Sequence, residues 1–347
     1  MRSLLAWTLP YLGERGVEQP RTIAEILIAH VLGVERLALY MEPERLLTAA
    51  ELAALRELVA RAGRHEPVQH LVGRWPFLGR DFEVGPCTLI PRPATEVLVE
   101  RALAWYRERG AGPVRALDLG TGTGCIAISL ALGFRAVLRP QTAGCRPLES
   151  GRALRGPAAP LPVLDLRADE RVARQEGSLE PAETSPAETG LHAGIDVVAT
   201  DLVPDAVELA RRNAARLGVA IDLRVGDLYR AIGLGEPPFD LIASNPPYVT
   251  DAEYAELDRN VAEYEPATAL RGGADGLDLV RRVVAGAEPR LAPDGLLLVE
   301  IGWRHREAAL GLASGPGWRD AEVLRDQDGL DRVLVARRTD VPWRPNR

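Results

Sequence analysis

The sequence has little cysteine, and its few cysteines and histidines do not form the spacing patterns of a disulfide framework or a metal site. The three cysteines among its 347 residues are Cys87, Cys125 and Cys145, and no two of them form a C-x-x-C pair. The five histidines show no ligand spacing either. We therefore expect a protein of a reducing compartment, without structural disulfides and without a bound metal ion.

Long apolar runs are also missing. The N-terminal stretch 1–7 is followed closely by Pro10 and then by charged residues, so it lacks the apolar core and cleavage site of a signal peptide. No run approaches the roughly 20 apolar residues that span a bilayer. From these two absences we expect a soluble, cytoplasmic protein that does not bind a membrane.

Positive charge is in deficit, with a formal net charge of −7 and an isoelectric point of about 5.5. Because binding along a nucleic-acid backbone depends on neutralising phosphates with basic side chains, direct nucleic-acid binding is not expected. The hydrophobic content of 46% is sufficient for a sizeable core, and the length suggests about two domains.

The first part of the chain has a helical pattern. Residues 1–72 carry apolar residues at helical spacing, and Thr48-Ala49-Ala50-Glu51 matches a capping box. These features predict a small helical domain, which is either a structural cap or a docking surface for a protein substrate. Residues 73–94 alternate apolar and polar side chains around Gly79, which predicts a connector with a β-hairpin.

The remaining residues, 95–347, alternate apolar strands with helices. This pattern predicts an α/β domain with a mainly parallel sheet covered on both faces. The expected strands cover residues 116–119, 195–201, 221–225, 239–243, 296–301 and 331–336. Residues 135–194 are much longer than the usual connection of about 2–6 residues and rich in Pro, Ala, Glu, Ser and Arg, so we expect a flexible insertion there.

Polar side chains stand at the ends of four expected strands. They are Asp118, Asp201, Asp227 and Asn245. Since the carboxyl ends of parallel strands share one edge, at about 5 Å per strand, a single ligand can contact all four. Helix capping and turn formation are the simpler alternative for the three acids.

A glycine-rich turn follows the first of these strands and precedes a helix. It consists of Gly120, Thr121, Gly122, Thr123 and Gly124. Glycines allow a close approach to a ligand, and the helix N-terminus favours a carboxylate. The spacing G-x-G-x-G, together with the neighbouring acids, suits the cationic sulfonium of S-adenosylmethionine (AdoMet) better than a dinucleotide, so we expect AdoMet as the methyl donor.

The loop Asn245-Pro246-Pro247-Tyr248 leaves the strand at 239–243. Its prolines stiffen the backbone and leave a side-chain amide, free carbonyls and a flat ring. These groups suit a planar NH2 group, with the Asn245 side-chain oxygen and the Pro246 carbonyl accepting its two N–H groups and Tyr248 packing against it. The loop predicts methyl transfer to a planar nitrogen, and by itself fits adenine as well as glutamine.

Several segments occur together in an order typical of one family. They are Leu89-Ile90-Pro91-Arg92-Pro93-Ala94-Thr95-Glu96, Asp118 to Gly124, Asn245 to Tyr248, Tyr264-Glu265-Pro266, Ala269 to Gly273, Asp275-Gly276-Leu277 and Glu300-Ile301-Gly302. With these segments the chain resembles the bacterial peptide chain release factor N5-glutamine methyltransferases (the PrmC/HemK family). The resemblance covers nearly the whole chain apart from 135–194. It implies a Rossmann-like class I AdoMet-dependent methyltransferase fold with a seven-stranded, mostly parallel sheet and a small N-terminal helical domain.

The resemblance also implies roles for single residues. It implies that the Gly120–Gly124 turn, Asp201, Asp227 and Leu228 bind AdoMet. Arg92 and the loop Asn245 to Tyr248 are then expected to bind the glutamine of the Gly-Gly-Gln motif of release factors, in support of translation termination. A monomer is expected. The sequence departs from the family at Ala94, where an acid is usual, and at Leu228, where an aromatic residue is frequent.

Three alternatives stay open. The same chemistry could act on a glutamine of a ribosomal protein, or on adenine N6 in nucleic acid, which would require a basic face near Asn245. The third alternative is a non-catalytic AdoMet-binding module, which predicts a damaged central motif.

Overall fold

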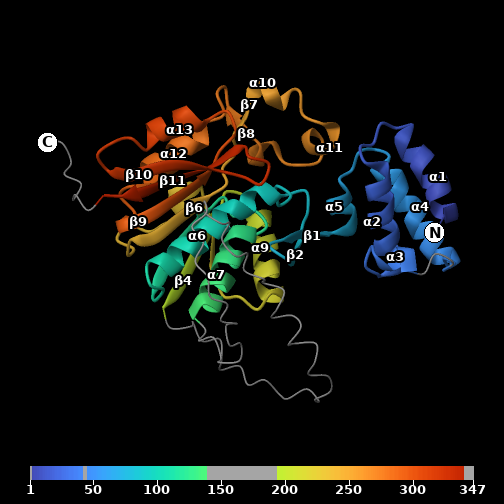
Figure 1. Ribbon diagram of the computed structural model, residues 1–347, viewed down its shortest axis with the longest axis horizontal. Helices are drawn as coiled ribbons and strands as arrows, with labels where there is room; N and C mark the ends of the chain where they lie inside the picture. The colour runs from blue at the N-terminus through green and yellow to red at the C-terminus, as the bar shows by residue number, and fades with distance from the viewer. Residues whose placement is uncertain (1, 42–44, 139–193, 340–347) are drawn as a thin grey trace, which may run out of the picture.

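The computed structural model describes residues 2–41, 45–138 and 194–339 (Figure 1). The helices are α1 (Arg2–Gly13), α2 (Pro20–Leu32), α3 (Ala38–Met41), α4 (Ala49–Ala62), α5 (Val68–Val72), α6 (Glu96–Glu108), α7 (Cys125–Leu138), α9 (Pro204–Arg216), α10 (Asp251–Tyr254), α11 (Arg259–Ala262), α12 (Asp278–Ala287) and α13 (Arg306–Leu312). Within this described part, no helix combines the length and the apolar character needed to cross a membrane.

The strands form three sheets. They are β1 (Arg74–Phe77), β2 (Arg80–Glu83), β3 (Val114–Leu119), β4 (Ile195–Asp201), β5 (Asp222–Val225), β6 (Phe239–Ser244), β7 (Val249–Thr250), β8 (Arg271–Gly273), β9 (Leu291–Glu300), β10 (Trp318–Arg325) and β11 (Asp331–Arg338). Seven of them form the central sheet, in the order β10-β11-β9-β6-β3-β4-β5. The five strands from β9 to β5 are parallel, and β11 is antiparallel to both β9 and β10. The expected seven-stranded, mostly parallel sheet is therefore confirmed.

Strand β10 was not among the strands expected from the sequence. Only Val323 of its eight residues is buried, so it lacks the apolar alternation by which a strand is recognised. β10 occupies the edge of the sheet, and β11 lies second from the edge. Charged side chains on such an edge strand discourage pairing with another chain.

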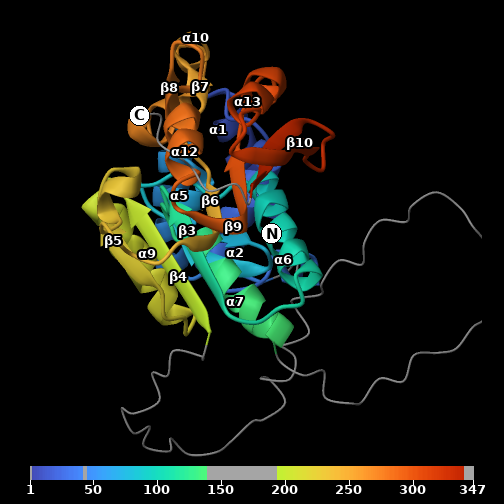
Figure 2. The same cartoon turned by 90° about the vertical axis from the view of Figure 1, so that its left-hand side faces the viewer.

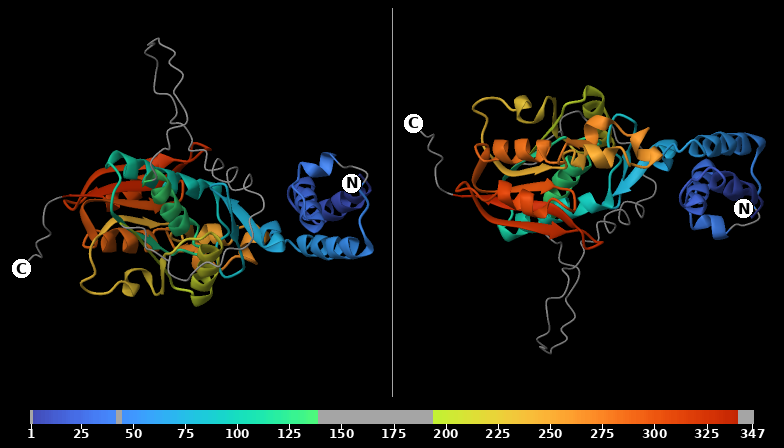
Figure 3. Two further views of the ribbon diagram at one scale, coloured as in Figure 1. Left: turned by 90° about the horizontal axis from the view of Figure 1, so that it is seen from below. Right: turned by 90° about the horizontal axis from the view of Figure 1, so that it is seen from above.

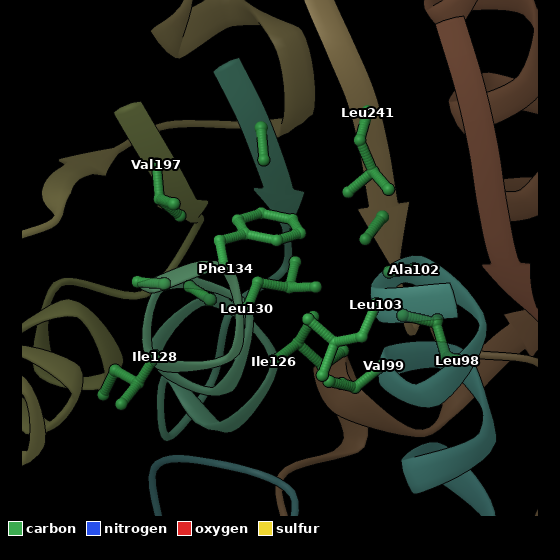
Figure 4. Close-up of a cluster of buried hydrophobic side chains, with 14 of the residues drawn as sticks. Leu98, Val99, Ala102, Leu103, Ile126, Ile128, Leu130, Phe134, Val197 and Leu241 are labelled. Carbon is green, nitrogen blue, oxygen red and sulfur yellow. The ribbon is translucent and has the colours of Figure 1, made fainter. Parts of the chain in front are cut away.

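The central sheet is buried on both faces, and its strands alternate between two apolar cores. In β3, Ala116 belongs to the core beneath α6 and α7, whereas Leu117 belongs to the core beneath α12 and α13. Figure 2 shows these two pairs of helices on opposite sides of the strands. Within the first core, Phe134 and Leu130 lie on the side of α7 that faces the strands, with α6 beside α7, as Figure 4 shows.

The N-terminal helices pack around an apolar core of their own. Its fully buried side chains include Leu12, Leu27 and Leu55, from α1, α2 and α4. The expected capping box is present at the start of α4, where the backbone N–H of Glu51 donates to the Thr48 hydroxyl at 3.2 Å. Figure 3 shows these helices at one end of the molecule. The Tyr264 hydroxyl bridges to this part by donating to the Arg64 carbonyl at 3.0 Å.

The interval 135–194 begins inside a helix, because α7 continues to Leu138. At its other end, Gly194 forms the turn before β4, and its carbonyl accepts a hydrogen bond from the backbone N–H of Val114. The expected flexible insertion concerns residues 139–193, which lie outside the described residues.

Asn213 of α9 joins the β1–β2 hairpin to the glycine-rich turn. The side chain is fully buried, its Oδ1 accepts from the Glu83 backbone N–H at 2.7 Å, and its Nδ2 donates to the Glu83 carbonyl at 3.0 Å. Nδ2 also donates to the Thr123 carbonyl at 2.9 Å. One amide thus satisfies three backbone groups from two segments that are far apart in the sequence.

We expect Asn213→Ala to lower the free energy of unfolding by roughly 2–5 kcal/mol, because it leaves these backbone groups without partners. Urea denaturation measures this change. The matched control is Asn260→Ala, since Asn260 is exposed in α11 and its loss should change the free energy of unfolding by no more than about 0.5 kcal/mol. Equal effects of the two substitutions would contradict the role given to Asn213.

Candidate active site

A cavity of about 360 Å³ lies at the carboxyl ends of β6, β3, β4 and β5. Its walls come from the loops that follow these four strands, from the segments 87–95 and 268–271, and from Leu279 and Arg282 of α12. The first of these segments precedes α6, and the second precedes and enters β8. Ligands of open α/β sheets bind at this edge of the sheet, so the cavity is the candidate active site.

The glycine-rich turn forms one wall of the cavity. Gly120, Thr121, Gly122 and Thr123 all line it, and α7 begins directly afterwards at Cys125. Gly124 has a φ of 82°, and a Cβ there would approach the Ile128 side chain to 2.9 Å and Ala210 Cβ to 3.1 Å. Only glycine fits this position without strain, because both its backbone conformation and its surroundings exclude a side chain.

Asp118, expected from the sequence to contact the cofactor, instead lies beneath this turn and does not line the cavity. It is fully buried inside β3, and its Oδ2 accepts from the Thr121 hydroxyl at 2.7 Å and from the Ala127 N–H at 3.1 Å. The other oxygen, Oδ1, is buried without a hydrogen-bond partner among the described residues. Burial, opposed by these hydrogen bonds and reinforced by the charge of Asp201, raises the pKa of Asp118 from 3.8 to about 7.

Asp201 and Asp227 line the cavity at the ends of the next two strands. The two carboxylate oxygens of Asp201 accept from the N–H groups of Gly122 and Val203, both at 2.9 Å, and burial raises its pKa. Asp227 pairs with Arg282, with Nη2 2.6 Å from Oδ2. Each acid is therefore held in place and still faces the cavity.

Leu228 lines the cavity beside Asp227 and has a φ of 49°. A positive φ is uncommon for a residue other than glycine, and such strained positions cluster at ligand-binding sites. Ala94, the other departure from the family pattern, does not line the cavity. The departure from the family pattern at Leu228 therefore alters a residue that lines the cavity, whereas the departure at Ala94 does not.

The loop after β6 reaches the cavity with Asn245 and Pro247, whereas Pro246 and Tyr248 are not among the lining residues. The Asn245 side chain donates from Nδ2 to the Thr95 hydroxyl at 3.1 Å. The Tyr248 hydroxyl donates to Oε1 of Glu300, a fully buried residue at the end of β9, at 3.0 Å. The Tyr248 ring therefore does not line the cavity, although the loop sequence predicts that it packs against the substrate.

Arg92 lines the cavity and is held by Glu265. Its Nη2 lies 2.5 Å from Oε1 of Glu265, whose Oε2 accepts from the Ile90 N–H at 2.9 Å. The Glu265 side chain is only 1% exposed, so one buried carboxylate fixes both the backbone and the cation of this segment.

Three functional residues were not identified from the sequence: Thr95, Glu265 and Glu300. Their segments were recognised as part of the family pattern, but their contacts join positions about 50 to 175 residues apart. Thr95 meets Asn245, Glu265 meets Ile90 and Arg92, and Glu300 meets Tyr248. Only the tertiary structure shows these pairs.

The residues present fit AdoMet. The volume lies within the range of roughly 300–1,000 Å³ that is usual for small-molecule sites. Asp201 and Asp227 supply acceptors, and the turn before α7 supplies backbone N–H groups. A ligand with hydroxyl groups, a carboxylate and a positive charge matches this set.

We expect Asp118→Asn to flatten the pH dependence of stability of the protein without ligand. Because the pKa of Asp118 is raised by folding, the folded state keeps a proton that the unfolded state releases, and the stabilisation present below pH 3.8 is lost as the pH rises towards 7. At roughly 1.4 kcal/mol per pKa unit, the wild type loses on the order of 3 kcal/mol through this group between pH 5 and 8. Urea denaturation of both proteins at the two pH values measures the difference, and parallel pH dependences would contradict this origin.

The comparisons with known proteins cover both parts of the chain. The family model of the PrmC N-terminal domain matches residues 3–73. Among solved structures, a methyltransferase from Pyrococcus furiosus is 16% identical and has a TM-score of 0.40, covering 85% of this chain and 100% of that chain.

Curated relatives match over most of the sequence. The release factor glutamine methyltransferase of Geobacter sulfurreducens is 37% identical over 337 residues, which cover 97% of this chain and 96% of the relative. The protein of the same name from Nitratidesulfovibrio vulgaris is 35% identical, covering 93% of this chain and 90% of the relative. That from Salmonella typhimurium is 32% identical, covering 94% and 95%. On this similarity, the chain belongs to the release factor glutamine methyltransferase family.

Proposed function

We propose that this protein transfers the methyl group of AdoMet to the side-chain amide nitrogen (N5) of the glutamine in the Gly-Gly-Gln motif of peptide chain release factors. Membership of the family supports the reaction and the substrate class. The observation in the structure that carries the proposal is the Asn245 amide at the cavity, whose Nδ2 is already bonded to Thr95. Its Oδ1 is left to accept a hydrogen bond from the substrate.

AdoMet supplies an electrophilic methyl group to this site. The turn Gly120–Gly124 and the start of α7 would hold its carboxylate end, and Asp201 would accept from its ribose hydroxyls. Asp227 and Leu228 would flank its adenine. These roles match the order of the strand ends along the sheet, β3, β4 and β5.

An amide nitrogen is a weak nucleophile, because its lone pair is delocalised into the carbonyl group. Asn245 Oδ1 would accept one N–H group of the substrate, which increases electron density on nitrogen and fixes its direction. The Pro246 carbonyl, expected to accept the other, belongs to a residue that does not line the cavity. Positioning of this kind contributes up to roughly 7–11 kcal/mol to catalysis. Tyr248 would hold the loop in its conformation through its hydrogen bond to Glu300.

The charges around the cavity favour a protein substrate over nucleic acid. The arginines that line the cavity are Arg92, Arg271 and Arg282. Each is paired with an acid: Arg92 with Glu265, Arg271 with Asp251 and Arg282 with Asp227. Binding to a phosphate backbone requires cations that are available to phosphates, so these pairs argue against the adenine-N6 alternative. We further propose that the protein acts on release factors in the cytoplasm, as a monomer.

The decisive variant is Asn245→Ala. We expect the rate of methylation of a release factor to fall by about 100-fold or more, because an acceptor at the reacting nitrogen is lost. The affinity for AdoMet should change little. Transfer of labelled methyl groups measures the rate, and calorimetry measures AdoMet binding.

The substrate is tested in the same assay. Release factors, ribosomal proteins and DNA are each incubated with the wild type, and peptide mass spectrometry locates the label. A release factor with Glu in place of the motif Gln should accept no methyl group. Near-wild-type activity of Asn245→Ala, or label found only on ribosomal protein or DNA, would refute the proposal.

A further inference from the structure

A series of polar side chains links Asn245, at the cavity, to a buried acid outside the cavity. Asn245 Nδ2 donates to the hydroxyl of Thr95, which is 2% exposed and lies just before α6. The Thr95 hydroxyl also lies near the carboxylate of Glu300, where it opposes the rise of the Glu300 pKa that burial causes. Glu300 accepts a further hydrogen bond at Oε1 from the Tyr248 hydroxyl. Asn245 is thus connected through Thr95 to an acid that does not line the cavity.

Burial of Glu300 is unfavourable in isolation. The residue is 0% exposed, and burial raises its pKa, opposed by the hydrogen bonds from Thr95 and Tyr248 and by the charges of Arg332 and Arg92. Its Oε2 is buried without a hydrogen-bond partner among the described residues. A hydroxyl hydrogen rotates to suit its partners, so the Thr95 hydrogen has a buried anionic acceptor available to it. These contacts give Glu300 a structural role, although it does not face the substrate.

The direction of these hydrogen bonds determines the orientation of the Asn245 amide. A threonine hydroxyl has one hydrogen to donate and can also accept, so alone it fits either end of an amide. An ionised carboxylate only accepts. When the Thr95 hydrogen points to Glu300, Thr95 must accept from Asn245, and this turns Nδ2 inwards and leaves Oδ1 for the cavity. In the opposite orientation the NH2 of Asn245 would face the NH2 of the substrate, and the two cannot bond.

We propose that Thr95 and Glu300 are positioning residues that fix the Asn245 side-chain amide with its oxygen towards the substrate nitrogen. Neither residue transfers a proton or contacts the methyl group in this role. The proposal rests on the proposed function, because it explains how the acceptor for the glutamine amide is oriented.

The Thr95 series separates hydrogen bonding from packing. Thr95→Val removes the hydroxyl at nearly constant volume, and we expect kcat for release factor methylation to fall by about 100-fold, the effect of a misplaced reacting group. The Kd of AdoMet should stay within about threefold of the wild type. Thr95→Ser keeps the hydroxyl and should restore kcat to within about fivefold. Ser129→Ala, which removes a buried hydroxyl from α7, is the matched control and should leave kcat unchanged.

Glu300→Gln tests the direction of the bonds. Glutamine keeps the size but introduces an NH2 donor, which requires Thr95 or Tyr248 to accept, and we expect kcat to fall at least tenfold without a fall in Tm. If Glu300 acts through Thr95, Glu300→Gln should change kcat less than threefold in the Thr95→Val background. If Thr95→Val does not fold, Thr95→Ala replaces it in both comparisons.

Three results would overturn the proposal. They are wild-type kcat in Thr95→Val, equal losses in Thr95→Ser and Thr95→Val, or an equal effect of Glu300→Gln in both backgrounds. These failures differ from a failure of the proposed function, in which the wild type itself would not methylate a release factor.

Discussion

Three buried carboxylates hold the loops that form the cavity, and the site depends on them. Asp118 fixes the glycine-rich turn through Thr121 and Ala127, and Glu265 fixes the segment of Ile90 and Arg92. Glu300 anchors the loop after β6 through Tyr248. A buried acid is unfavourable unless it is hydrogen-bonded, so each loop has one conformation that satisfies its acid and many that do not.

This arrangement explains how the loops around the cavity are held in one conformation. The β-sheet brings the ends of β6, β3, β4 and β5 side by side, but it does not determine the path of the chain after each strand ends. Backbone N–H groups and hydroxyls that converge on an acid supply this missing constraint. Asn213 acts in the same way with an amide in place of a carboxylate, because it joins the β1–β2 hairpin to the turn at Thr123.

The features that can be predicted from the sequence are those that depend on short stretches of it. The parallel strands, the capping box at Thr48 and the row of polar residues along one edge follow from apolar periodicity and from the chemistry of turns. Strand β10 is missed because only Val323 of it is buried, so its pairing with β11 determines its conformation. The placement of Asp118 beneath the turn, the turning of Tyr248 towards Glu300 and the contact of Thr95 with Asn245 depend on packing between distant segments. Neither periodicity nor motif spacing contains this information.

The acidic side chains at the two ends of the parallel strands have different partners. At the amino end of the parallel strands, Arg115 of β3 pairs with Asp196 of β4 and with Glu236. Arg224, near the carboxyl end of β5, pairs with Glu236 as well. These bonds from Arg224 and Arg115 lower the pKa of Glu236 to about 2, so the network stays ionised at neutral pH. At the carboxyl end, Asp201 is bonded to backbone N–H groups and has no arginine partner among the described residues. Arginines thus neutralise the acids at the amino end of the strands, whereas Asp201, held by backbone N–H groups, lines the cavity where the methyl donor of the proposed reaction would bind.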